Sequence, residues 1–300
     1  MHGPWEHQGL RKHYEHYDTR TSLLHSEFGV EGMTNRRALE AVVVDEDRWP
    51  PDRSNPVYEH LGAWWNNSAL VQEVFGGRIG DVDTMRRASQ WLQYDGLRYA
   101  VEATLRRGAG VLPWQFNEPF PNAWCTCAVD YHAIPKPAYY GVARAYRGAP
   151  SARFETCAWG GEREVRAVVS APARFVDVDG TVVATSGPGE IAAPLDAFAS
   201  DVFLLDLAGG ANRYVMTRTE NLEPLLDLPA AHLDVQPSNS LLLGWSGVTL
   251  RNMSDVAAIG VVVEDVICSD NVLDLLPGEE RTIDVFGGAT PRVEGWNVRG

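Results

Sequence analysis

The chain has 300 residues, and 45% of them are hydrophobic, which is enough for two or three domains with apolar cores. The formal net charge of −14 argues against nucleic acid and against an anionic membrane as partners. No apolar stretch approaches the ~20 residues of a membrane helix. The N-terminus has neither the basic nor the apolar region of a signal peptide, so we expect a cytoplasmic protein.

Residues 1–148 alternate between strand-like and helix-like segments. A short apolar run predicts a strand over residues 22–27, and "AGVLPWQF" predicts a second strand over 110–116. Between them, apolar residues at helical spacing predict a helix over 84–107. A further helix is expected in "KPAYYGVARAYR", where Pro137 lies in the first turn. This order of strands and helices is typical of parallel α/β units.

After residue 148 the chain changes to short segments of alternating polarity that are separated by turn residues. Asp179-Gly180 and Gly209-Gly210 lie between such segments and predict tight hairpins. No long helical period occurs in this part of the sequence. The pattern predicts two small immunoglobulin-like β-sandwiches, over residues 149–223 and 224–300.

The cysteines and histidines show no spacing that is specific for a metal site or a disulfide framework. Cys125 and Cys127 in "WCTC" allow metal binding or redox cycling, but two buried thiols on one strand face are the favoured interpretation. His13 and His16 are one helical turn apart. Without an acidic or cysteine partner at a fitted spacing, they are expected on a polar helix surface. Neither a metal nor another cofactor is therefore expected.

Both predicted strands of the first region end in polar residues. The first ends at His25-Ser26-Glu27, and the second in the run from Trp114 to Glu118. In a (β/α) barrel, functional residues collect at the carboxyl ends of the strands. Alternation along the first strand predicts that His25 and Glu27 share one face. A tryptophan beside a carboxylate suits a sugar pocket, because the ring covers the C–H faces of a pyranose. A tryptophan in the barrel core, and a capping or salt-bridged glutamate, are the alternatives.

Four motifs support a more specific interpretation. In chain order they are "LLHSEFGVEG", "LPWQFNEPFPNAW", "VDYHAIPKPAYYGVARAYR" and "SDNVLDLLPGEERTIDV". Together they resemble glycoside hydrolase family 2, most closely its β-mannosidase-like members. The resemblance spans almost the whole chain. It implies that residues 1–148 form the C-terminal part of a catalytic (β/α)8 barrel, and that two immunoglobulin-like β-sandwiches follow it.

The resemblance also implies roles for individual residues. Glu27 matches the nucleophile of a retaining glycosidase, which forms a covalent glycosyl-enzyme while a second carboxylate acts as acid and then as base. Trp114 matches the aromatic floor of the sugar subsite, and the peptide bond after this residue is often cis in related enzymes. His25, Asn117 and Glu118 are expected to bind the substrate, a β-linked oligosaccharide or another glycoside with a terminal β-mannosyl or related unit.

The sequence departs from the family in its acid–base residue. The family carries that glutamate after an asparagine on the fourth barrel strand, and no such pair precedes Glu27. Asn117-Glu118 follows the nucleophile instead, so a pocket or structural carboxylate is favoured for Glu118. Only about two of the eight barrel units are recognisable. We therefore expect a fragment that is inactive alone and whose partner is the missing N-terminal part or a second copy of the chain.

A function from another class stays open. In this alternative the chain is a non-catalytic remnant whose β-sandwiches bind carbohydrate or a partner chain. Trp64-Trp65 in "GAWWNNS" suit sugar stacking under either hypothesis, although packing under a long loop is the commoner role of such a pair. The "SEFG" form of the first motif favours a mannoside. Selection among mannoside, galactoside, glucuronide and glucosaminide depends mostly on loops outside the motifs.

Overall fold

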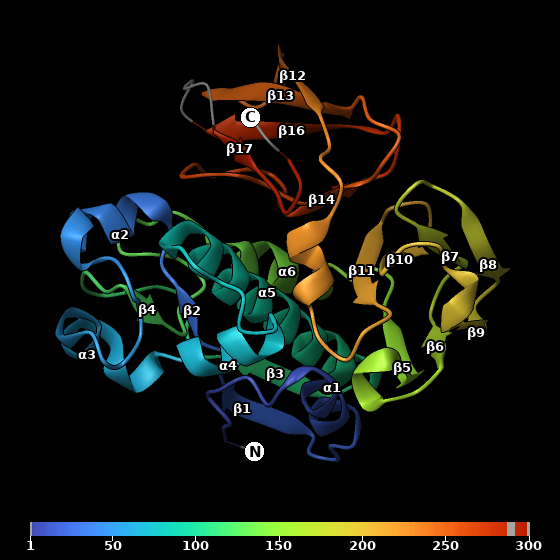
Figure 1. The fold of residues 1–300 in the computed structure, drawn as a ribbon, viewed down its shortest axis with the longest axis horizontal. Coiled ribbons are helices and arrows are strands. Elements are labelled where there is room, and N and C mark those ends of the chain that lie inside the picture. Colours follow the sequence, from blue (N-terminus) through green and yellow to red (C-terminus); the bar gives the residue numbers. More distant parts are fainter. Residues whose placement is uncertain (1, 287–291, 299–300) are drawn as a thin grey trace. The chain divides into compact units, whose positions relative to one another are not determined.

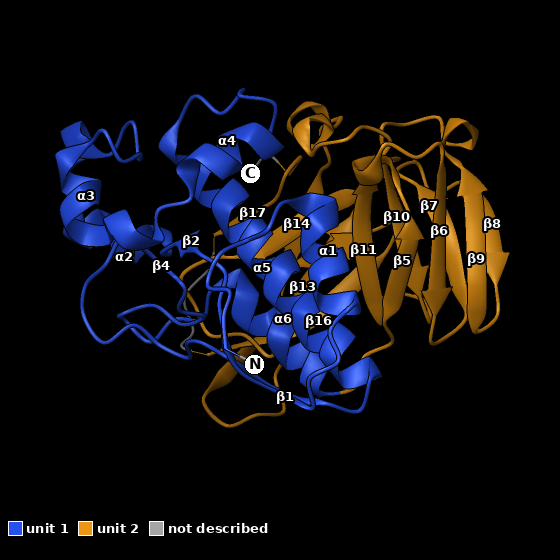
Figure 2. Ribbon diagram, turned by 90° about the horizontal axis from the view of Figure 1, so that it is seen from below, with its two compact units in different colours: residues 1–147 blue, residues 148–300 orange. Residues whose placement is uncertain are grey.

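The computed structural model describes residues 2–286 and 292–298. Contacts within the chain divide it into two compact units, Met1–Arg147 and Gly148–Gly300, shown in blue and orange in Figure 2. In the predicted 224–300 domain, residues 287–291 and 299–300 lie outside the described residues. In the described ranges, every α-helix belongs to the first unit and strands dominate the second (Figure 1). None of the described helices has the length and apolar character that crossing a membrane requires.

The first unit combines helices with short strands. In chain order its elements are α1 (Leu10–Asp18), β1 (Leu24–Phe28), β2 (Gly32–Met33), α2 (Arg36–Val42), α3 (Pro56–Gly62), α4 (Ser68–Val74), α5 (Val82–Arg106), β3 (Gly110–Pro113), β4 (Trp124–Cys125) and α6 (Pro137–Tyr146). Short 3₁₀ turns occur at Asp45–Asp47 and Ala63–Trp65. The segment between β2 and α5 thus holds three short helices, α2, α3 and α4.

β1 and β3 form a parallel pair, with Leu24 opposite Gly110. β1 overlaps the strand predicted over 22–27, β3 is shorter than the strand predicted over 110–116, and α5 between them matches the helix predicted over 84–107. The carboxylate of Asp81 accepts a hydrogen bond from the Thr84 N–H, one of the donors that a helix N-terminus leaves unpaired. Most side chains of α5 are buried, so tertiary packing stabilises the helix more than propensity does. The parallel pairing brings the carboxyl ends of β1 and β3 to one edge.

The N-terminal segment lies along β1 on the side away from β3. His2 forms an isolated parallel bridge with Glu27, and the Gly3 N–H donates to the Glu27 carbonyl at 2.7 Å. The Gly29 N–H donates in turn to the Pro4 carbonyl at 3.0 Å. This segment therefore continues the parallel sheet by one short stretch, which the sequence analysis did not predict.

The second unit is built from short strands. They are β5 (Ala152–Thr156), β6 (Glu164–Val169), β7 (Ala173–Asp177), β8 (Val182–Ser186), β9 (Gly189–Pro194), β10 (Val202–Leu207), β11 (Asn212–Thr217), β12 (Leu233–Ser238), β13 (Trp245–Asn252), β14 (Ala258–Val263), β15 (Leu273–Leu275), β16 (Glu280–Phe286) and β17 (Val293–Glu294). Short 3₁₀ turns at Ala158–Gly160, Leu195–Ala197 and Glu223–Asp227 are its described helical segments.

These strands pair in two successive groups of sheets. The first group contains the orders β11-β10-β7-β8 and β5-β6-β9, and the second contains β12-β13-β16 and β15-β14-β17. Every pairing between these named strands is antiparallel, as the alternating pattern predicts. The predicted hairpins also form: Gly180 lies between β7 and β8 with φ of 88°, and Gly209 and Gly210 lie between β10 and β11 with φ of 67° and 93°. Glycine is favoured there because positive φ is strained for other residues.

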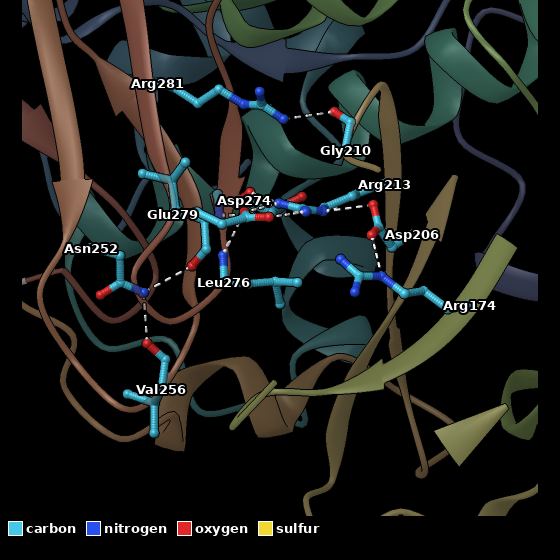
Figure 3. Close-up of polar contacts among 12 residues, drawn as sticks. Arg174, Asp206, Gly210, Arg213, Asn252, Val256, Asp274, Leu276, Glu279 and Arg281 are labelled. Carbon is cyan, nitrogen blue, oxygen red and sulfur yellow. Dashed lines mark hydrogen bonds and ion pairs between the residues drawn. The ribbon is translucent and has the colours of Figure 1, made fainter. Parts of the chain in front are cut away.

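Charged side chains form a buried cluster in the second unit, which Figure 3 shows. Arg213 on β11 donates from Nε to Asp206 on β10 at 3.0 Å, and from its terminal nitrogens to both oxygens of Glu279 at 2.6 and 2.7 Å. Arg174 on β7 donates to the second oxygen of Asp206 at 2.7 Å. Burial alone raises the pKa of Glu279, but the hydrogen bonds and charge of Arg213 outweigh this and the pKa is lowered. Ionised Glu279 thus ties the turn before β16 to β11.

Candidate active site

The Glu27 carboxylate lies near the carboxyl end of β1. Its side chain is 30% exposed. The indole Nε1 of Trp5 donates a hydrogen bond to Oε1 at 2.8 Å, and Nδ1 of His2 lies 3.7 Å from Oε2. The rings of His2 and Trp5 meet edge to face, with centroids 4.9 Å apart. The N-terminal segment therefore contacts both oxygens of the carboxylate, while the side chain keeps access to solvent.

Trp114 follows β3 at the neighbouring strand end. Phe28 and Pro113 are paired across β1 and β3, and the Trp114 N–H donates to the Phe28 carbonyl at 2.6 Å. The Trp114–Gln115 peptide bond is cis, as the resemblance implied. The Trp114 ring is partly exposed and lies 5.4 Å, between centroids, from that of Trp65. The rings of Trp65 and Trp114 therefore lie at the carboxyl end of β3, the strand beside the one that carries Glu27.

Gly29 explains the glycine of the "SEFG" motif. A Cβ at this position would lie 2.7 Å from the Trp114 carbonyl oxygen and 3.1 Å from the Thr126 methyl group. At 2.7 Å, a Cβ atom would overlap the Trp114 carbonyl oxygen, which belongs to the backbone and cannot rotate away. The glycine therefore permits the close approach of the two strand ends that carry Glu27 and Trp114.

His25 lies in the interior and not on the surface beside Glu27. Its side chain is 1% exposed, its Nε2 lies 2.8 Å from the Gly3 carbonyl oxygen, and its ring packs on Tyr17 and Phe28. Burial lowers the pKa of His25, although the contact with Gly3 acts in the opposite direction. His25 therefore supports the N-terminal segment through the Gly3 carbonyl, and its expected role in substrate binding stays a prediction.

Asn117 and Glu118 have different environments despite being adjacent. Asn117 is exposed and forms an isolated main-chain bridge with Val129. Glu118 is only 7% exposed, and its Oε2 lies 2.5 Å from Cys125 Sγ and 3.2 Å from Cys127 Sγ. The structure thus brings Glu27 and Trp114 to one edge and holds the Glu118 carboxylate against two thiols.

A second carboxylate borders a cavity of about 710 Å³ in the first unit. Glu31 is 6% exposed, and its Oε2 accepts hydrogen bonds from the His7 N–H at 3.1 Å and from Asn67 Nδ2 at 3.3 Å. Burial raises the pKa of Glu31 to about 7, although its own backbone and His7 counteract this. Arg53 and Asn66 also line the cavity. The cavity therefore offers several hydrogen-bonding groups and a carboxyl that changes charge near neutral pH.

Comparisons with known proteins place these features in context. No family model matches the chain. The curated Beta-mannosidase B of Aspergillus niger is 28% identical over 146 residues and that of Aspergillus terreus is 27% identical, each match covering 45% of this chain and 17% of the relative. A solved Beta-D-Mannosidase from Dictyoglomus thermophilum matches with a TM-score of 0.70 and 15% identity over 95% of this chain and 39% of that one. The exo-beta-D-glucosaminidase CsxA matches with a TM-score of 0.69 and 16% identity over 99% and 45%.

The chain resembles the C-terminal portion of β-mannosidase-like members of glycoside hydrolase family 2. This finding confirms the resemblance that the four motifs indicated. The match to each curated relative spans 17% of the relative's length, and the chain covers less than half of either solved structure. The likeness to the solved structures extends over both compact units.

Two residues beside Glu27 in this β-mannosidase-like chain escaped the sequence analysis. His2 and Trp5 contact the carboxylate, yet they belong to a segment with a single isolated bridge. Such a short pairing has no hydrophobic periodicity, so pattern analysis does not detect it. The aromatic and histidine residues crowded into "HGPWEH" were the available signal.

The Glu31 carboxyl predicts a specific pH dependence of stability. Its pKa is raised from an ordinary value of 4.5 to about 7. Between these values the folded chain binds more protons than the unfolded chain, so the free energy of unfolding falls as the pH rises. The fall that Glu31 contributes is about 3 kcal/mol. We expect Glu31→Gln to remove it, because an amide retains an acceptor oxygen but does not titrate.

Urea unfolding of the full chain at several pH values between about 4.5 and 7 gives the free energy of unfolding of the first unit and so measures this effect. Glu40→Gln, which alters an exposed carboxylate on α2, is the matched control and should follow the unaltered chain. Identical slopes for the unaltered chain and Glu31→Gln would show that Glu31 does not carry the dependence.

Proposed function

We propose that the chain provides the nucleophile and the aromatic floor of a retaining glycosidase site for terminal β-mannosides. The observation that carries this proposal is the setting of Glu27 at the end of β1, hydrogen-bonded by Trp5 and adjoined by the strand end of Trp114. A nucleophilic carboxylate attacks through one oxygen; Trp5 donates to Oε1, and Oε2 has His2 Nδ1 3.7 Å away. The tryptophan ring supplies an apolar face for the sugar.

The proposed reaction has two displacements. Glu27 attacks the anomeric carbon, the glycosidic bond breaks, and the leaving oxygen takes a proton from a carboxylic acid. Water then attacks the resulting ester while the same carboxylate removes its proton, which releases the sugar and restores Glu27. In this mechanism the acid–base carboxylate comes from outside residues 1–300, because Glu118 is engaged by Cys125 and Cys127.

We also propose that residues 1–148 are the end of a (β/α)8 barrel and that 149–223 and 224–300 are immunoglobulin-like sandwiches. The parallel pairing of β1 and β3 around α5 supports the first part, and the antiparallel sheet groups support the second. Leu24 on β1 is 50% exposed and Leu112 on β3 is 56% exposed. Apolar side chains on a small sheet are typical of a surface that further elements cover.

A mannosyl fluoride with a second fluorine on the sugar ring tests the nucleophile directly. Fluoride leaves without protonation, so the reaction needs no acid residue, and the ring fluorine slows hydrolysis of the ester. We expect this reagent to add one sugar to Glu27, which peptide mass spectrometry locates. Glu27→Gln should take up no label, because its amide does not displace fluoride, whereas the surface control Glu40→Gln should be labelled like the unaltered chain.

The labelling result also separates the two classes of function. A non-catalytic remnant that only binds carbohydrate would leave the reagent unreacted in the unaltered chain. Label on a residue other than Glu27 would contradict the assignment of the nucleophile. A label on Glu27 with the glucosyl reagent but not with the mannosyl reagent would overturn the mannoside specificity alone.

A further inference from the structure

Three metal-ligating atoms converge in the interior of the first unit. Oε2 of Glu118 lies 2.5 Å from Cys125 Sγ and 3.2 Å from Cys127 Sγ, and the two sulfur atoms are 3.0 Å apart. All three residues are buried, with exposed fractions of 7%, 6% and 1%. Glu118 lies in the loop after β3, Cys125 is the last residue of β4, and Cys127 lies two residues beyond it.

The surroundings of this group supply one positive charge. Lys136 is 2% exposed, and its Nζ donates to the Gly32 carbonyl at 3.0 Å. Burial lowers the pKa of Lys136, while the neighbouring cysteines and Glu118 act to raise it. With both thiols ionised, the carboxylate and two thiolates carry three negative charges. A divalent cation together with the Lys136 ammonium neutralises them, which is what a buried ionic site requires.

We propose that Glu118, Cys125 and Cys127 form a structural site for a thiophilic divalent cation of the Zn²⁺ type. Two thiolates and one carboxylate are a donor set that zinc accepts, and two soft sulfur ligands disfavour Mg²⁺ and Ca²⁺. Bond lengths of ~2.3 Å to sulfur and ~2.1 Å to oxygen place ligand atoms roughly 3.5 Å apart around a tetrahedral ion. The three atoms therefore need to separate by at most about 1 Å to admit the ion, with a water as fourth ligand.

Ion binding displaces the two thiol protons to solvent. Without an ion, the hydrogen bond between the two cysteines and burial both raise the pKa of Cys125, so the thiol is protonated. A bound cation lowers that pKa and exchanges each S–H proton for a metal–sulfur bond. The site needs no oxidant or reductant.

The ion would stabilise the loop that carries Trp114. Gln115 donates from Nε2 to Cys127 Sγ at 3.2 Å, and its carbonyl accepts from the Ala128 N–H at 3.0 Å. A cation bound by both Glu118 and Cys125 would link the two ends of the segment between them. The sequence analysis expected two buried thiols and no metal, since it had no basis for bringing Glu118 to the cysteines.

Cobalt substitution during refolding of the full chain tests the site, because thiolate ligation to Co²⁺ gives a charge-transfer band in the near ultraviolet. We expect about one bound ion per chain and a band from two thiolates. Cys125→Ser and Cys127→Ser should each weaken the band, and Glu118→Gln should weaken binding by at least about tenfold. Cys157→Ser and Cys268→Ser are matched controls, since both residues are buried cysteines of the second unit, and they should bind like the unaltered chain.

Because a cysteine variant can misfold, a second measurement uses the unaltered chain alone. Zn²⁺ loading should slow alkylation of Cys125 and Cys127 in the unaltered chain while leaving Cys157 and Cys268 unchanged, as peptide mass spectrometry reports. Cobalt bound without a thiolate band would show ligation by other groups and overturn the proposal. The same holds for a band that persists when Cys125 and Cys127 are both serine, and for alkylation rates that Zn²⁺ does not change.

Discussion

Residues 1–300 will hydrolyse an activated aryl β-mannoside at no more than a trace rate, and a β-linked mannobiose not detectably. The natural substrate has a poor leaving group, and loss of general acid assistance typically costs ~10²–10⁴-fold in rate. Glu118, the glutamate that resembles the family's acid–base pair in sequence, is buried against Cys125 and Cys127. A dinitrophenyl leaving group needs no proton, so the Glu27 carboxylate alone suffices for its departure.

The trace activity depends on Glu27 in this mechanism. Glu27→Gln should lower it by at least about 10⁴-fold, that is, below detection, because the amide cannot form the glycosyl ester. Initial rates with both substrates, for the unaltered chain, Glu27→Gln and the surface variant Glu40→Gln, measure the effect. Turnover of mannobiose that Glu118→Gln abolishes would identify Glu118 as the acid–base residue. It would also disprove the proposal that this carboxylate comes from outside residues 1–300.

Strand and helix patterns in the sequence were sufficient for the framework of the first unit. The apolar runs at β1 and β3 and the helical spacing of α5 reflect burial, and burial is what hydrophobic periodicity records. The placement of His25 was not predictable in the same way. Its burial depends on the N-terminal segment, whose Gly3 carbonyl contacts the ring, and on an irregularity in β1 that alternation does not anticipate.

Contacts between polar side chains were the other part that the sequence could not reveal. Glu118 was expected to be a pocket or structural carboxylate, but its contacts with Cys125 and Cys127 depend on the path of the loop after β3. Trp5 reaches Glu27 across 22 positions of sequence. The proposal for Glu27 rests on the "SEFG" motif, because family resemblance carries spatial information that periodicity lacks. The charged cluster of the second unit was not predicted either, because hydrophobic periodicity does not show which charged residues pair.

Removal of Arg213 is expected to destabilise the second unit by about 3–5 kcal/mol, because a buried charge pair loses one partner. The Arg213 side chain is 5% exposed and that of Asp206 is fully buried. Arg213→Met keeps a side chain of similar length, leaves Asp206 paired with Arg174 and deprives Glu279 of two hydrogen bonds (Figure 3). Hydrogen exchange of the β10 and β11 amides, followed by mass spectrometry, measures the change in opening free energy.

The comparison that isolates the buried charge uses a control and a compensating change. Arg153→Met removes an arginine that is 48% exposed and pairs with Glu155 on β5, so a cost between about 0 and 1 kcal/mol is expected. Asp206→Leu together with Arg213→Met should recover part of the loss, since the buried carboxylate that has lost one of its two arginines is gone. An Arg213→Met chain whose β10 and β11 amides exchange as slowly as those of Arg153→Met would contradict the prediction. It would mean that the sheets are stable without the cluster.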